Sequence, residues 1–125
     1  MKKLILSIII ISLSAMVYAS HNPKIEITPE SWDFGIATEI KTLTHKFQIK
    51  NAGDDTLKIK HITTSCDCVV VAIPFRKLYP NEIIELVVKF DLKQIKAKGK
   101  IKHDIIIETD DPENRFKIIS LFVEL

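Results

Sequence analysis

Apolar and polar residues alternate with a period of two along most of this sequence, and this pattern limits what the chain can fold into. Between residues 43 and 50, one set of positions carries Leu43, Phe47 and Ile49 and the other carries threonine, lysine and glutamine. Successive side chains of a strand point to opposite faces, so each such run has one inward face. No segment after residue 19 keeps helical apolar spacing over ten residues. The pattern therefore predicts an all-β fold.

Turn-forming clusters divide these alternating runs into short strands. Residues 51–55, 79–82 and 110–114 are rich in Asn, Asp, Gly and Pro, which favour turns. A chain of 125 residues is long enough for one ordinary core. Several short strands at this spacing predict a single β-sandwich. We expect strands over residues 24–28, 31–35, 43–51, 56–63, 66–73, 83–92, 100–109 and 115–124.

The first 19 residues have the features of a secretory signal peptide. Lys2 and Lys3 precede an apolar run over residues 4–17, and the small residue Ala19 suits a cleavage site. The apolar run is short for a membrane span, although an uncleaved anchor is the alternative. No cysteine follows the run directly, which argues against a lipid anchor. We expect a signal peptide over residues 1–19 and a domain over residues 20–125. The protein would be exported to the periplasm, the cell envelope or the exterior. It would contact the membrane only through the leader, during export.

Charge argues against a nucleic-acid partner. Without Lys2 and Lys3, the chain has 16 basic residues against 16 acidic residues. Nucleic-acid binding draws most of its affinity from neutralising phosphates, which requires a strongly basic surface. We therefore expect no nucleic-acid binding.

Both cysteines, Cys66 and Cys68, lie one residue apart. In an extended strand such residues are about 6.5 to 7 Å apart, whereas disulfides prefer Cα separations of about 4.4 to 6.8 Å. A bridge would need a bulge or kink, would be readily reduced, and would close too small a loop to add much stability. A labile disulfide or redox pair and a structural or inert pair both remain open.

Metal binding is a third hypothesis for the pair. Two thiolates on one side of a strand can share a soft ion such as Cu(I) or Zn(II). His45, His61 and His103 each fall on the apolar side of their strands, and any of them could complete a site. The simpler interpretation is that they are half-buried histidines with hydrogen-bond partners. No other cofactor is expected.

The sequence offers no arrangement typical of an enzyme. The carboxylate pairs Asp54-Asp55 and Asp110-Asp111 both lie in turn clusters, where Asp bonds the local backbone. A thioredoxin-like role needs Cys-x-x-Cys near a βαβ unit, and the chain has neither. We expect no catalysis.

Two segments are candidates for partner contact. The first is a basic stripe that would protect a solvated edge or attract an acidic partner. The second is the final strand, which is apolar on both faces and is therefore either central or covered by a partner. If it lay at an edge, it would accept a partner strand. These candidate edge residues are Lys96, Lys98, Lys100, Lys102, Ile119, Leu121 and Val123.

Five motifs together resemble the DUF1573 family: Trp32-Asp33-Phe34-Gly35, residues 45–53 (HKFQIKNAG), Cys66-Asp67-Cys68, Leu78-Tyr79-Pro80-Asn81-Glu82 and Thr109-Asp110-Asp111-Pro112. The resemblance spans residues 25–125. It implies an exported bacterial immunoglobulin-like sandwich related to the major sperm protein and ASH group, a family whose biochemical role is not established. Asp67 replaces the usual glycine between the cysteines, and Val69 the usual threonine after them. Asn81 replaces the glycine after the loop proline, and Asn tolerates positive φ.

From the fold-like pattern without a catalytic constellation, we expect an exported binding or assembly module of the bacterial cell envelope. Its partner would be another envelope protein, contacted through an edge strand or loops. The alternative is a Cu(I)- or Zn-binding or thiol-redox protein centred on Cys66 and Cys68.

Overall fold

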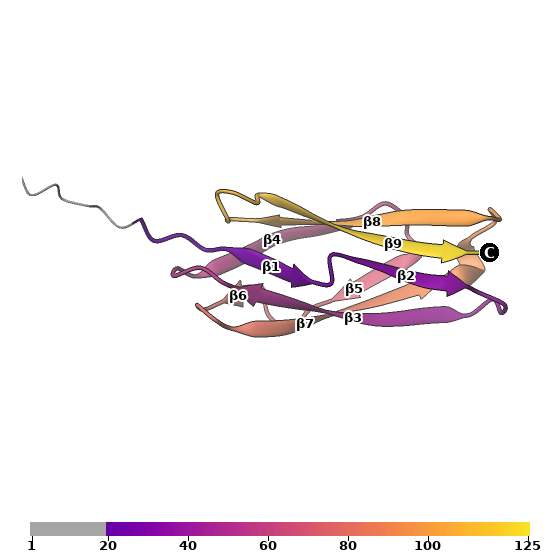
Figure 1. The fold of residues 1–125 in the computed structure, drawn as a ribbon, viewed down its shortest axis with the longest axis horizontal. Coiled ribbons are helices and arrows are strands. Elements are labelled where there is room, and N and C mark those ends of the chain that lie inside the picture. Colours follow the sequence, from indigo (N-terminus) through magenta and orange to yellow (C-terminus); the bar gives the residue numbers. More distant parts are fainter. Residues whose placement is uncertain (1–19) are drawn as a thin grey trace, which may run out of the picture.

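The computed structural model describes residues 20–125 as two facing β-sheets (Figure 1). The predicted leader lies outside the described residues. None of the helices within residues 20–125 has the length and apolar character needed to cross a membrane. The elements are β1 (Ile25–Thr28), β2 (Ser31–Ile36), β3 (Thr42–Asn51), β4 (Leu57–Thr64), β5 (Val69–Ala72), β6 (Lys77–Leu78), β7 (Ile83–Asp91), the 3-10 turn η2 (Leu92–Gln94), β8 (Lys100–Thr109) and β9 (Phe116–Glu124).

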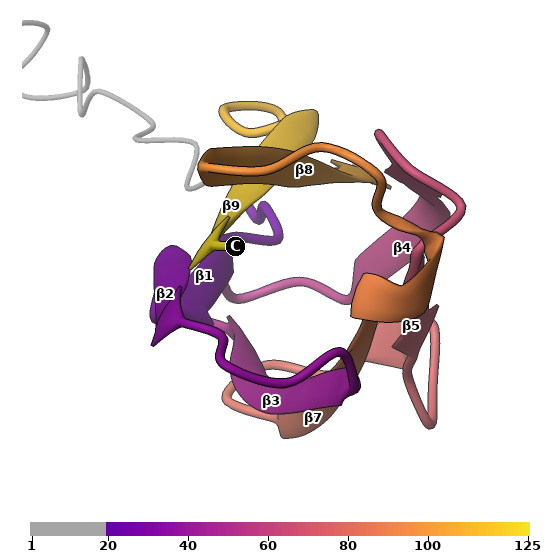
Figure 2. The same cartoon turned by 90° about the vertical axis from the view of Figure 1, so that its right-hand side faces the viewer.

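The strand order gives each sheet two edges. One sheet has the order β1-β3-β7-β5, and the other has the order β2-β9-β8-β4-β6. All neighbouring pairs are antiparallel except β2 and β9, which are parallel. Figure 2 shows β3 and β7 opposite β8 and β9, with β1 and β2 on one side and β4 and β5 on the other. The predicted all-β immunoglobulin-like sandwich is confirmed.

The core lies between the inward faces of the two sheets. The faces predicted by alternation are the ones buried: Phe47 and Ile49 on β3, and Leu86 and Val88 on β7, are fully buried. At about 25 cal/mol per Å² of apolar area, this burial is the main stabilising contribution. Asn81 has φ of 68°, as expected for the residue that replaces glycine in the loop before β7.

At one end of the sandwich, two buried polar side chains hold the loops and the start of β1. Asn51 Nδ2 donates hydrogen bonds to the carbonyls of Asp55 (2.7 Å) and Leu78 (3.0 Å), and its Oδ1 accepts from Lys24 N–H and Gly53 N–H. Asp111 accepts from Ile25 N–H at 2.9 Å and Glu113 N–H at 2.9 Å. We call this the closed end. The prediction that these carboxylates bond their own turn is confirmed for Asp111, whereas Asp110 Oδ1 accepts from Lys58 N–H of β4 at 2.8 Å.

The strand predicted over residues 66–73 is shorter, and this is a correction. β5 begins at Val69, so Cys66 and Cys68 lie in the turn between β4 and β5. The turn is closed by a hydrogen bond from Val69 N–H to the Cys66 carbonyl at 3.2 Å. The two-residue strand β6 was not predicted, because a pair of residues carries no alternation.

Of the two candidate edge segments, the final strand lies inside a sheet. Within the described residues, β9 is paired on both sides, by β2 and β8, and β8 is paired by β9 and β4. Ile119, Leu121 and Val123 are core residues, no more than 2% exposed. Lys96 and Lys98 belong to the loop after η2, whereas Lys100 and Lys102 lie on the interior strand β8. β9 is therefore central, one of the two positions expected for a strand that is apolar on both faces, and the candidate edge role of Ile119, Leu121 and Val123 is wrong. Lys100 and Lys102 precede the part of β8 that pairs with β4, so the role of the basic stripe stays a prediction.

Candidate functional site

The cysteine pair lies at the end of the sandwich opposite Asn51 and Asp111, which we call the open end. Cys66 and Cys68 form a disulfide with a Cα–Cα distance of 5.1 Å. The turn brings the two residues within the usual bridging range, so the kink expected for a bridge is supplied by the end of β4. Cys68 N–H donates to Cys66 Sγ at 3.0 Å. Cys68 is fully buried and Cys66 is half-buried, so the bridge lies at the surface of the core.

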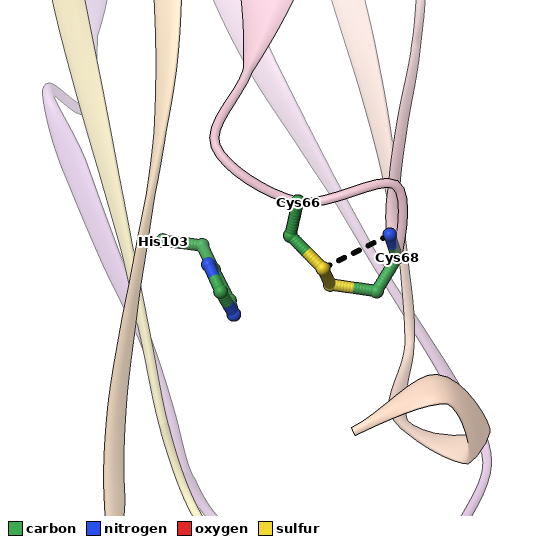
Figure 3. A group of neighbouring side chains, drawn as sticks. All are labelled: Cys66, Cys68 and His103. Carbon is green, nitrogen blue, oxygen red and sulfur yellow. Dashed lines mark hydrogen bonds between the residues drawn. A yellow bond between two sulfur atoms is a disulfide. The ribbon is translucent and has the colours of Figure 1, made fainter. Parts of the chain in front are cut away.

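His103, on β8, faces this disulfide (Figure 3). One ring nitrogen of His103 and the two sulfur atoms all lie within 4.8 Å of one another. Ser65 Oγ lies 3.1 Å from His103 Nδ1 and accepts a hydrogen bond from Asp104 N–H at 2.9 Å. The Phe90 ring, with its centroid 5.6 Å from that of His103, borders the imidazole. The sequence therefore identified one correct neighbour of the cysteines among its three histidines.

His45 is not part of this group. Its ring stacks on Trp32 with centroids 3.8 Å apart and meets Phe34 and Phe47 edge-on. His45 Nε2 is buried without a hydrogen-bond partner among the described residues, and burial lowers the pKa of the imidazole below its usual value. The ring is therefore a packing element between the sheets.

His61 is also outside the group, and its predicted facing is wrong. The register of β4 against β8 shifts between Ile59 and His61, which is a β-bulge. An extra residue reverses which side chains face inward from that point. His61 is consequently exposed, and Ile62 takes the inward position. Alternation alone could not reveal this shift.

A second feature lies beside β5, at the side of the sandwich. Among residues 20–125, β5 pairs only with β7, and the last part of β4 pairs only with β8. Between these two strands runs a groove of about 460 Å³, lined by Ile62, Thr64, Arg76 and residues 69–73. Arg76 also donates a hydrogen bond to the carbonyl of Lys60 at 3.2 Å. We call it the β4–β5 groove.

On the side of this groove, the backbone of β5 has groups that no other described strand pairs. Asp91 N–H donates to the Cys68 carbonyl at 2.8 Å, and in the same register Val70 is opposite Lys89. Because antiparallel strands alternate between bonded and non-bonded pairs, the N–H and C=O of Val71 point away from β7. Sequence reasoning missed this edge, since the alternating run from Cys66 predicted a strand but not its neighbours.

Sequence comparison identifies a family for nearly the whole described chain. The family model described as "Protein of unknown function (DUF1573)" matches residues 25–121. No curated protein matches the sequence.

Solved structures share the fold at low identity. A protein of unknown function from Porphyromonas gingivalis W83 has a TM-score of 0.77 at 22% identity over 88% of this chain and 50% of that chain, so the present chain spans half its length. The ASH / PapD-like domain 7 of human CEP192 has a TM-score of 0.63 at 13% identity, covering 90% of this chain and 92% of that one. SSP-19, an MSP-domain protein like family member of Caenorhabditis elegans, has a TM-score of 0.59 at 11% identity, covering 79% and 98%. These likenesses concern the fold.

Proposed function

The chain belongs to the DUF1573 family, and we propose that it is an exported, non-enzymatic binding module of the bacterial cell envelope that holds an extended segment of a protein partner in the β4–β5 groove. The observation that carries this proposal is the pair of unpaired strand edges facing each other across the groove. Strand addition uses such an edge for main-chain hydrogen bonds and pockets for alternate side chains.

The chemistry of the groove defines the segment that would fit. The N–H and C=O of Val71 would pair with the backbone of the added strand. Ile62 and Val71, both half-buried, offer aliphatic contacts to every second side chain of that strand. Arg76 would favour an acidic residue at one end. The partner is therefore an extended segment with alternating apolar side chains.

Site-specific photo-cross-linking in cells tests this proposal. We expect a cross-linker at Val70, which is 59% exposed on β5, to capture a discrete partner. The matched control is a cross-linker at Ile118, which is 54% exposed on β9 and lies away from the groove. Equal capture at both positions, or capture at neither, would contradict the proposal.

A backbone variant separates strand addition from simple contact. Val71→Pro removes the outward N–H while leaving the hydrogen bonds of β5 to β7, since those are made by the neighbouring residues. We expect Val71→Pro to lose the cross-link formed from position 70. Once the partner is identified, its binding can be measured with purified protein. Val70→Ser, which keeps the backbone intact, should then retain partner binding. Undiminished binding by a folded Val71→Pro variant would rule out strand addition.

Export has its own test. The full chain should fractionate with the periplasm or cell envelope, and a chain that lacks residues 1–19 should stay in the cytosol. The same location for both chains would contradict export without touching the groove.

A further inference from the structure

We propose that Cys66, Cys68 and His103 form a binding site for Cu(I) that is closed by the disulfide and opens when the disulfide is reduced. The site lies at the open end of the sandwich, in the turn that joins β4 to β5 at the end of the β4–β5 groove, and the inference does not depend on the proposed binding of a partner. Its basis is that two sulfur atoms and one imidazole nitrogen lie within 4.8 Å of one another.

The distances suit a three-coordinate ion. Thiolate and imidazole ligands lie about 2.3 Å and 2.0 Å from a bound zinc ion, and Cu(I) bonds are similar, so three ligands in a plane are about 4 Å apart. Reduction breaks the S–S bond and lets the sulfur atoms separate toward that spacing. The Cα–Cα distance of 5.1 Å leaves room for this change by side-chain rotation alone. The site therefore needs shifts of about 1 Å rather than a rearrangement of the sheets.

His103 is held in the orientation that a ligand needs. Ser65 Oγ, 3.1 Å away, engages Nδ1 and is itself fixed by Asp104 N–H. The Asp104 carboxylate accepts a hydrogen bond from Ser120 Oγ at 2.9 Å, which joins β8 to β9. Ser65, in the turn after β4, is therefore held by a residue that is itself fixed in the sheet. A metal-binding histidine commonly donates its other N–H to such a partner, which fixes ring orientation. In the tautomer that donates Nδ1–H to Ser65 Oγ, Nε2 carries the free lone pair.

The ligand set favours Cu(I) over Zn(II). Two thiolates and one imidazole are soft ligands, and Cu(I) accepts two or three of them, whereas structural zinc takes four. Within residues 20–125, no fourth Cys, His, Asp or Glu belongs to this group. Cys68 is fully buried and Phe90 borders His103, so water has little access to a fourth position. The site would then hold Cu(I) as a trigonal CuS₂N complex.

The disulfide makes metal binding depend on the redox state. Reduction adds two electrons and two protons to the Cys66–Cys68 bond and gives two thiols, with a dithiol donor being oxidised to its own disulfide. Binding of Cu(I) then displaces the two thiol protons to solvent. Half-buried Cys66 is the sulfur that a donor thiol can reach, and buried Cys68 is the leaving sulfur. The site therefore has two forms: an oxidised form closed by the disulfide, and a reduced form that binds the metal.

Anaerobic titration with Cu(I) against the chromogenic competitor bicinchoninate tests the inference. We expect the reduced protein to withdraw one Cu(I) per chain and the oxidised protein to withdraw none. Cys66→Ser and Cys68→Ser should each abolish this binding. X-ray absorption of the copper-loaded protein should give two sulfur ligands and one nitrogen ligand. A disulfide that resists reduction in the folded protein would overturn the inference.

Two histidine variants provide the matched control. His103→Ala should weaken Cu(I) binding at least about tenfold, since even outer partners of metal ligands contribute about 10 to 100-fold. His45→Ala removes a histidine from the same sandwich but outside the group, and should leave Cu(I) affinity unchanged. Circular dichroism checks that each variant is folded. Ser65→Ala, which keeps the imidazole of His103, should lose less Cu(I) affinity than His103→Ala. Equal affinity of His103→Ala and the wild type would overturn the assignment of His103.

Discussion

The two ends of the sandwich use their polar residues differently. At the closed end, Asn51 and Asp111 are buried, and their side chains make hydrogen bonds to the backbone of loops and of β1. At the open end, His103 bonds a serine hydroxyl and the bridge spans three residues, while Cys68 and the Phe90 ring beside His103 contribute apolar packing. The closed end therefore stabilises the fold, and the open end is free to carry chemistry.

The largest effect should come from Asp111→Ala at the closed end. This change leaves Ile25 N–H and Glu113 N–H without the oxygen atoms that accept their hydrogen bonds. An unsatisfied buried donor costs about 1 to 3 kcal/mol, so we expect a loss of about 3 kcal/mol in the free energy of unfolding, measured with urea. The control is Asp104→Ala at the open end, whose carboxylate accepts from Ser120 and lies near Lys102; we expect about 1 kcal/mol or less. Equal losses would remove the distinction between the ends.

Acid sharpens the same contrast. Burial of Asp111 opposes ionisation, but the hydrogen bonds from Ile25, Glu113 and Asn114 outweigh it and lower the pKa of the carboxyl below its usual 3.8. A carboxyl with a lowered pKa in the folded state stabilises fully above pH 3.8, and this stability is lost as the pH falls through the folded value. Asp111→Asn should therefore be less stable at neutral pH and lose less stability on acidification than the wild type. Identical acid dependence in both proteins would contradict this role.

A somewhat smaller loss is expected from Gly53→Ala, also at the closed end. A Cβ at this position would overlap the backbone of Asn22, Pro23 and Lys24, with Lys24 N only 2.6 Å away. Overpacking of this kind costs about 1 to 3 kcal/mol, and we expect about 2 kcal/mol because residues 20–24 can shift partly. Thermal unfolding measures the effect. A variant as stable as the wild type would show that this segment is not seated against Gly53.

Most of the fold could be predicted from the sequence, because alternation over residues 43–50 and 83–90 fixes both strand type and buried face. The strand neighbours could not be predicted, since pairing depends on contacts between distant segments. For this reason the sequence left open whether β9 was central or at an edge, and the structure places it between β2 and β8. A bulge in β4 turned His61 outward, and a turn shortened the strand that would have held Cys66. The sequence named Cys66, Cys68 and three histidines as candidates, and only the folded chain shows that His103 is the one beside the cysteines.

Reduction of the disulfide tests the central claim most directly, namely that the open end carries chemistry rather than stability. A bridge that closes a three-residue loop constrains the unfolded chain little. Its expected contribution to the free energy of unfolding is no more than about 1.5 kcal/mol. Urea unfolding of the oxidised and the fully reduced protein, side by side, gives the value. We predict that the reduced protein stays folded with a loss within that limit. Unfolding on reduction, or a loss as large as that of Asp111→Ala, would contradict the claim.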